Sequence, residues 1–378
     1  MGSSLRLGRF FGIDLLVHWT FALLFVYVAG VYVANGEPVA ASLGAMGLVL
    51  ATFACVVLHE YGHALTARRF NVPTRDITLY PIGGVARLER MPEKPAEELA
   101  VAIAGPLVNV AIAALLFLGL AASGAGLAPI DTVNLLSADG SFWSDLFWIN
   151  VVLVVFNLVP AFPMDGGRVL RALLATSMPY VRATRIAAGV GQVLAFGFAA
   201  WGLMGGGIFL LIIAFFVFVG AQQEATATTM RLAIRGLPVS QAMLTEFTTL
   251  GPGANVREAA ERLMAGSEQE FPVLGVDGRL MGVLTRKRLV QALAEGGPDT
   301  RVVDAMAPAC EAVEATSMLD AALEKLQADE CALLPVERGG RLVGVLTMEN
   351  VAELLMLSEA MQRRTGERGG VQGVLAPR

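Results

Sequence analysis

The chain has 378 residues, of which 55% are hydrophobic and 16% are charged. Soluble chains average about 25% charged residues, so this composition excludes an ordinary soluble enzyme. The chain holds 28 Lys and Arg against 33 Asp and Glu, and this balance excludes the basic surplus of a nucleic-acid-binding protein. These numbers predict an integral membrane protein.

Long apolar runs occur six times in the N-terminal part of the chain, and crossing a bilayer takes about 20 residues. We expect membrane spans at about residues 12–34, 39–67, 99–122, 143–162, 184–203 and 206–222. The glycines at 205–207 predict either a turn or a kink between the last two runs. The first run is too long for a signal peptide and no clear cleavage site follows it, so we expect a retained span.

Lys and Arg are confined to the segments on one side of these spans. The basic residues there are Arg6, Arg9, Arg68, Arg69, Arg75, Arg87, Arg90, Lys94, Arg168, Arg171, Arg182 and Arg185. The loops on the other side, around 35–38, 123–142 and 204–205, hold none, and the long one carries Asp131 and Asp139. By the positive-inside rule, both termini and the basic loops are cytoplasmic.

The second span contains His59-Glu60-Tyr61-Gly62-His63, which has the HExxH spacing. Residues i and i+4 share a helix face, so both imidazoles can bind one Zn²⁺ while Glu60 acts as a general acid/base. A carboxylate at membrane depth costs on the order of 2.5–3.5 kcal/mol, so a functional role is the default expectation. The alternative is a pair of buried histidines beside a Glu that extends to the membrane surface.

A second acid at membrane depth, Asp165, follows the fourth span within the stretch NLVPAFPMDGGR. Prolines and glycines end the helix there, which brings Asp165 to the cytoplasmic end of the span. Catalytic zinc takes three protein ligands, and Asp165 is the candidate third ligand. Two histidines, one Asp and an ionised Glu60 around Zn²⁺ give a cluster near neutrality. A turn with an N-capping Asp is the alternative.

Three motifs on successive spans carry a family resemblance. HEYGH in the second span, AGPLVN (Ala104–Asn109) in the third and NLVPAFPMDGG in the fourth together resemble the site-2 protease family, which are intramembrane zinc metalloproteases. The resemblance covers residues 10–222. It implies that His59, His63 and Asp165 are the zinc ligands and that Glu60 is the catalytic acid/base.

The resemblance also places Asn109 and Asn157 near the active centre. Their amides could donate to a developing oxyanion, and a helix–helix hydrogen bond is the alternative. The segment 71–91 predicts a strand pair at the cytoplasmic face, with a plain surface loop as the alternative. In similar proteins the Gly83-Gly84 region offers an edge to an extended substrate. His18 is expected to make a structural hydrogen bond rather than bind metal.

Residues 237–357 contain an internal repeat. Gln241-Ala-Met243 recurs as Asp304-Ala-Met306, and Gly282-Val-Leu-Thr285 recurs as Gly344-Val-Leu-Thr347. Each copy has strand-like apolar pieces, a glycine turn, another strand and a helix. This pattern resembles tandem CBS domains, an α/β pair that often binds adenine nucleotides.

Two features limit what the repeat implies. Arg288 and Asn350 stand where that family has the Asp that contacts ribose, so a bound adenine nucleotide and a structural pair that forms a homodimer remain alternatives. The cysteines, Cys55, Cys310 and Cys331, show no paired spacing. We therefore expect neither a disulfide framework nor a cysteine zinc site.

The sequence as a whole predicts a multi-pass α-helical membrane protein of six spans with a cytoplasmic α/β tandem CBS domain. We expect a transmembrane metalloprotease domain at 1–222, a linker at 223–236, the CBS pair at 237–357 and a flexible tail at 358–378. The expected activity is Zn²⁺-dependent hydrolysis of membrane-spanning protein substrates in the bilayer of a prokaryotic cell, regulated by the CBS pair. A CBS-gated transporter or channel is the alternative, and metal content distinguishes the two.

Overall fold

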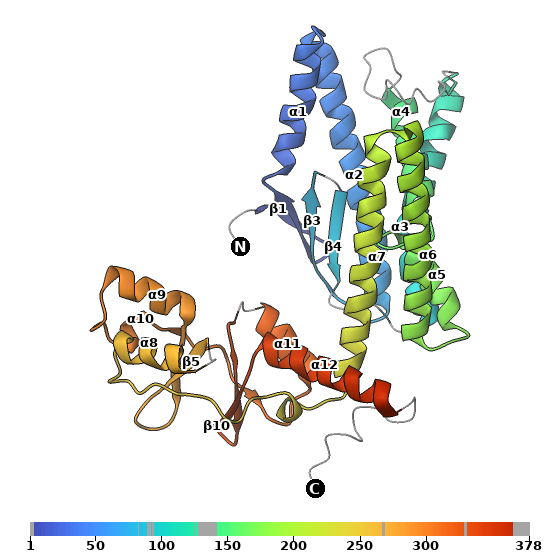
Figure 1. Cartoon of the computed structure of the whole chain (residues 1–378). Helices are drawn as coiled ribbons and strands as arrows, with labels where there is room; N and C mark the ends of the chain where they lie inside the picture. The colour runs from blue at the N-terminus through green and yellow to red at the C-terminus, as the bar shows by residue number, and fades with distance from the viewer. Residues whose placement is uncertain are drawn as a thin grey trace. The chain divides into compact units, whose positions relative to one another are not determined.

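The computed structural model divides into two compact units, Met1–Thr228 and Thr229–Arg378 (Figure 1). The residues that it describes are 4–81, 83–88, 92, 94–124, 126–127, 142–266, 269–328 and 331–365. Arg90, Asp131 and Asp139 of the charge argument lie outside the described residues, and so does the expected tail from residue 366 onward.

The first unit begins with a mixed sheet of strand order β1-β2-β3-β4. Its strands are β1 (Ser4–Phe10), β2 (Ile13–His18), β3 (Thr74–Tyr80) and β4 (Gly83–Leu88). β1 pairs antiparallel with β2, β2 pairs parallel with β3, and β3 pairs antiparallel with β4. The strand pair expected within 71–91 is therefore confirmed, apart from residues 82 and 89–91, which are not described.

The first apolar run, expected as one span at 12–34, is instead a strand followed by a helix. Its start forms β2, and helix α1 (Phe21–Ala34) begins only after it. The reason is a distant partner, because Leu15 of β2 pairs with Ile77 of β3. Both side chains pack with Phe21 and Phe53 in one buried core, which joins the sheet to α1 and to the next helix.

Apolar helices make up most of the rest of the first unit. Within the described residues, those long and apolar enough to cross a membrane are α2 (Val39–Arg69), α3 (Pro95–Ser123), α6 (Tyr180–Trp201) with the turn after it, and α7 (Ile208–Ile234). α1 and α4 (Phe142–Asn157) are apolar but shorter, with 14 and 16 residues. Length and composition thus support four of the six expected spans.

The glycine break at 205–207 is a turn. The π-helical segment η1 (Gly202–Gly206) follows α6, and Gly205 and Gly207 have φ angles of +113° and +91°, which glycine tolerates. Helices α6 and α7 then lie side by side (Figure 1). Gln192 Nε2 donates to Gln222 Oε1 at 3.1 Å across the pair.

The second unit contains two copies of one α/β motif, with sheets of order β5-β6-β7 and β10-β9-β8. The elements are η2 (Val239–Gln241), α8 (Val256–Ala265), β5 (Glu270–Leu274), β6 (Leu280–Thr285), α9 (Arg286–Glu295), α10 (Val302–Ala305), β7 (Ala307–Pro308), β8 (Val313–Glu314), α11 (Leu319–Ala328), β9 (Leu334–Arg338), β10 (Arg341–Leu346) and α12 (Met348–Thr365). The helix α12 therefore continues past residue 357, where the flexible tail was expected to begin. Leu354 and Leu355, earlier in the same helix, pack against the core of the second copy.

The repeated motifs of the two copies meet each other. β7 pairs with β6 of the first copy, and Leu244 bridges to Val345 of the second. A Cβ on Gly282 would lie 2.5 Å from the Ala307 carbonyl oxygen, and one on Gly344 would lie 2.9 Å from that of Leu244. Glycine is therefore required in both GVLT motifs, because each one packs against the segment that follows the Ala-Met pair of the other copy.

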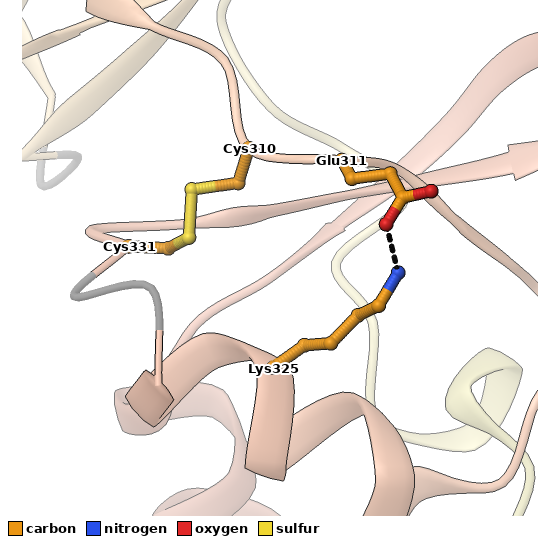
Figure 2. The surroundings of a disulfide bond; sticks show 4 residues. All are labelled: Cys310, Glu311, Lys325 and Cys331. Atoms are coloured by element: carbon orange, nitrogen blue, oxygen red, sulfur yellow. Dashed lines mark hydrogen bonds and ion pairs between the residues drawn. A yellow bond between two sulfur atoms is a disulfide. The ribbon is translucent and has the colours of Figure 1, made fainter.

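Cys310 and Cys331 form a disulfide in the second copy, and the expectation that no disulfide is present was wrong (Figure 2). Their Cα atoms are 6.3 Å apart, and 21 residues separate them in the sequence. One cysteine precedes β8 and the other precedes β9, and these two strands pair in parallel. Strand pairing therefore brings together two cysteines whose spacing gave no signal. Cys55 is free and buried.

Candidate metal centre

Helix α2 brings His59 and His63 onto one buried face. Their Nε2 atoms are 3.0 Å apart, and Asp165 Oδ2 lies 3.2 Å from the first and 3.1 Å from the second. The three side chains form the metal-ligand group found among the described residues. The structure therefore joins the i, i+4 histidine pair to the acid that the sequence suggested as its third partner.

Asp165 is placed by a break between two helices. α4 ends at Asn157, and Asp165 is the first residue of α5 (Asp165–Ala175), while the N-cap position belongs to Met164. A Cβ on Gly166 would overlap the preceding loop, and one on Gly167 would lie 2.6 Å from Phe162 N. The two glycines thus let the loop pack on the first turn of α5, with the Asp165 carboxylate facing the histidines rather than capping the helix.

A buried ion cluster holds α5 against its neighbours. Arg171 Nε donates to Glu98 Oε1 of α3 at 2.7 Å, and Arg171 Nη1 donates to Glu224 Oε1 of α7 at 2.6 Å. Arg171 and Glu98 are both almost fully buried, and the guanidinium lies 5.0 Å from the ring centre of Tyr180 in α6. Buried charges of this kind need their partners, so the cluster fixes α5, and with it Asp165, to three helices.

The donor atoms fit a tetrahedral zinc. His59 Nδ1 faces Asn109 Oδ1 at 2.5 Å, and His63 Nδ1 faces the Val101 carbonyl oxygen at 2.7 Å. Each oxygen accepts a hydrogen bond from an Nδ1–H group, so each Nε2 carries a lone pair. These two lone pairs converge with an Asp165 oxygen, and a bound cation satisfies this arrangement. Ligands about 2 Å from zinc at tetrahedral angles lie about 3.3 Å apart, close to the separations observed here.

Gly105 of α3 makes room for the two imidazoles. A Cβ at this position would overlap the ring of His63 and would lie 2.7 Å from His59 Nε2. Gly62 has a related role in α2, because a Cβ there would lie 2.7 Å from the Ala104 carbonyl oxygen of α3. These glycines let α2 and α3 approach closely enough to place the histidine rings between them.

A cavity of about 600 Å³ opens beside the histidine–aspartate group. Glu60 lines it, and Glu60 Oε2 accepts a hydrogen bond from Ala86 N–H of β4 at 3.3 Å. The lining also includes β4, the end of α4, the start of α5 with the two residues before it, and apolar side chains of α7 such as Phe216. The cavity therefore combines a carboxylate, a strand and an apolar wall around the candidate metal centre.

The structure separates the two asparagines that the sequence analysis treated together. Asn157 lines the cavity, whereas Asn109 is buried behind His59 and its Nδ2 donates to Asn150 Oδ1 of α4 at 2.8 Å. His18 Nδ1 lies 2.7 Å from Thr20 Oγ1, away from the metal-ligand group. Sequence reasoning missed Asn150, although an asparagine inside an apolar helix is a signal that could have found it.

The chain matches known families over both of its units. The sequence profile of peptidase family M50 matches residues 47–138 and 129–198, and that of the CBS domain matches 239–295 and 302–357. Zinc metalloprotease MJ0392 of Methanocaldococcus jannaschii is 32% identical, over 75% of this chain and 78% of its own. The chain belongs to peptidase family M50. It is an intramembrane zinc metalloprotease that carries a CBS domain pair.

One further relative and one solved structure are also similar to this chain. The Rip3 protein of Mycobacterium tuberculosis is 30% identical over 94% of this chain and 93% of its own. The solved site-2 protease of Methanocaldococcus jannaschii is 37% identical, with a TM-score of 0.44 over 59% of this chain and 95% of that one. The Rip3 match extends along nearly the whole chain and so includes both the M50 region and the CBS pair.

Proposed function

We propose that His59, His63 and Asp165 hold one Zn²⁺ and that Glu60 is the general acid/base of peptide-bond hydrolysis. The convergence of three buried donor atoms, with each imidazole oriented through its Nδ1, carries this assignment. Zinc, when bound, supplies a Lewis acid that polarises a carbonyl and lowers the pKa of water.

Glu60 is a carboxylate beside this donor set that is not one of the three proposed metal ligands. Ala86 N–H donates to its Oε2, and Glu60 lines the cavity. The substrate carbonyl and the attacking water would meet in this cavity. From there Glu60 takes a proton from the attacking water and gives one to the leaving amine. Arg168 and Asn157 line the same cavity, so their donors can stabilise negative charge on the carbonyl oxygen. Asn109 instead orients His59.

The proposed substrate is a membrane-spanning protein segment in an extended conformation. A helix hides its amide carbonyls in its own hydrogen bonds, so the segment must unwind before cleavage. β4 stands at one end of the sheet order, and Gly84, Val85 and Ala86 line the cavity, which supports strand addition by the substrate. Phe156 and Ile212 also line the cavity, and they suit apolar substrate side chains.

The proposed topology has six spans with both termini in the cytoplasm of a prokaryotic cell. At about 1.5 Å per residue, α1 is about 21 Å long, against a hydrocarbon core of about 30 Å. Local thinning of the bilayer accommodates a short span of this kind. The segregation of Lys and Arg among the loops supports the cytoplasmic placement of the termini and the basic loops.

The CBS pair, at 237–357, is the proposed regulatory module on the cytoplasmic side. Arg288 Nη1 donates to the Ala305 and Met306 carbonyls, both at 3.4 Å, and Asn350 Oδ1 accepts from the Thr347 hydroxyl at 2.6 Å. Binding of an adenine nucleotide and formation of a homodimer stay predictions. Calorimetry with AMP and ATP tests the first, and sedimentation of the purified protein tests the second.

Metal analysis of the purified protein tests the proposed function and separates it from the transporter alternative. The wild type is expected to hold one tightly bound zinc per chain. His59→Ala, His63→Ala and Asp165→Ala are each expected to lose both the zinc and the cleavage of a membrane-spanning substrate. Full zinc occupancy in Asp165→Ala would remove Asp165 from the ligand set, and a wild type without zinc would overturn the proposal.

A further inference from the structure

A chain of hydrogen bonds leads from His59 to the backbone of α4. His59 Nδ1 faces Asn109 Oδ1 at 2.5 Å, and Asn109 Nδ2 donates to Asn150 Oδ1 at 2.8 Å. Asn150 Nδ2 in turn donates to the Leu146 carbonyl oxygen at 2.8 Å. Asn109 and Asn150 are both fully buried, so their amides depend on protein partners for hydrogen bonding.

This chain of hydrogen bonds has a fixed direction, because it ends on a carbonyl oxygen that can only accept. Only a donor can face the Leu146 oxygen, so the Asn150 amino group points toward it and the Asn150 oxygen faces Asn109. That oxygen requires the amino group of Asn109, which leaves the Asn109 oxygen facing His59. The imidazole must then carry its proton on Nδ1, and its Nε2 is free to bind a metal.

In His63 a single hydrogen bond to a backbone carbonyl fixes the same Nδ1–H tautomer. Its Nδ1 lies 2.7 Å from the Val101 carbonyl oxygen of α3, which fixes the tautomer directly. For His59, two amides connect the ring to the Leu146 carbonyl of α4. Each histidine of the candidate metal centre is therefore oriented by a backbone carbonyl of a neighbouring helix.

We propose that Asn150 is a positioning residue for the reaction, acting through Asn109 to hold His59 in the Nδ1–H tautomer with Nε2 facing the metal. This inference rests on the proposed function, because it assumes His59 as a zinc ligand. Asn150 does not itself contact the metal-ligand group. Partners in this outer position typically change metal affinity about 10–100-fold when they are removed.

If Asn150 served only in helix packing, a different property of the side chain at position 150 would matter. Packing requires a side chain of the right volume between α3 and α4, and leucine meets that requirement. Positioning requires an acceptor toward Asn109 together with a donor toward Leu146. A protonated Asp has both, since its O–H donates to the carbonyl and its other oxygen accepts, and burial favours the protonated form.

The experiment compares zinc affinity in full-length wild type, Asn150→Leu and Asn150→Asp by competition with a chelator. Asn150→Leu is expected to bind zinc about 10–100-fold more weakly, and Asn150→Asp is expected to keep most of the affinity that Asn150→Leu loses. Ser144→Ala, which removes another buried polar group from α4, is the matched control and should bind zinc like the wild type.

Ring-nitrogen NMR of the zinc-free protein measures the tautomer of His59, which would not change if Asn150 served only in helix packing. Wild-type His59 is expected to carry its proton on Nδ1, and Asn150→Leu is expected to show a mixture of tautomers. The inference is wrong if wild-type His59 is protonated on Nε2, or if Asn150→Leu keeps the wild-type tautomer and zinc affinity. If Asn150→Leu misfolds, a wild-type spectrum with the proton on Nε2 still overturns the inference, and zinc affinity of Asn150→Asp below that of the wild type by about 10-fold or more does so as well. A wild type that binds no zinc overturns the proposed function instead.

Discussion

A single glycine, Gly105, leaves room between α2 and α3 for the two imidazoles of the candidate metal centre. Because a Cβ on Gly105 would overlap the ring of His63, Gly105→Ala is expected to displace both histidines and to lose zinc and proteolysis. Gly119→Ala lies on the same helix with no atom within 4 Å of its Cβ, so it should keep both properties. Metal content and cleavage of the purified variants provide the comparison, and a Gly105→Ala protein with full zinc would contradict this reading.

At the residue scale, the sequence predicts which residues share one helix face, but it does not predict contacts between residues of different helices. His59 and His63 are four residues apart in one helix, so the sequence alone places them on one helix face. Asn150 stands 41 residues after Asn109, and this separation in the sequence does not predict a contact between them. The role of Asn109 behind His59, rather than in the cavity, depends on the same contact between helices.

At the element scale, the four long apolar helices were predictable, whereas the sheet was predictable only in part. A continuous apolar run fits a strand or a helix equally well, and residues 13–18 become β2 because β3, about 60 residues later, provides a partner. The strand pair of β3 and β4 was predicted from a local turn between them. The exchange of partners between the two CBS copies also depends on contacts that a repeat alone does not specify.

The disulfide makes a testable contribution to the second unit. Linking cysteines 21 residues apart restricts the unfolded chain, so Cys310→Ser is expected to lower the free energy of unfolding of this unit by about 3 kcal/mol. Lys325 pairs with Glu311 beside the disulfide (Figure 2), and Lys325→Ala should change the unfolding free energy much less, because this pair is exposed.

Urea unfolding of the second unit, with and without a reducing agent, measures the free energy of unfolding of the wild type, Cys310→Ser and Lys325→Ala. Wild type in the reducing agent should match Cys310→Ser, because both lack the same link. Equal stability of the wild type and Cys310→Ser without the reducing agent would show that the disulfide contributes nothing.

The proposed cytoplasmic location makes a separate prediction about the same two cysteines inside the cell. In a cytoplasm that keeps thiols reduced, alkylation at lysis should find both cysteines largely in the thiol form.

At the scale of the whole molecule, the charge segregation makes a prediction about sidedness. Single cysteines at Ser3 and at Asp299, an exposed residue of the second unit, should both be labelled from the cytoplasmic side by a membrane-impermeant reagent. The parent protein measures the background from the native cysteines. Labelling of the two positions from opposite sides would require an odd number of spans and would refute the topology.

The central claim is that one carboxylate performs the proton transfers beside a metal that it does not bind. Glu60→Gln in the purified full-length protein tests it most directly, with zinc content and cleavage of a membrane-spanning substrate measured on the same sample. The account predicts one zinc per chain and cleavage slower by about 10²–10⁴-fold, the usual contribution of general acid–base catalysis. Near-wild-type cleavage by a zinc-loaded Glu60→Gln protein would contradict it.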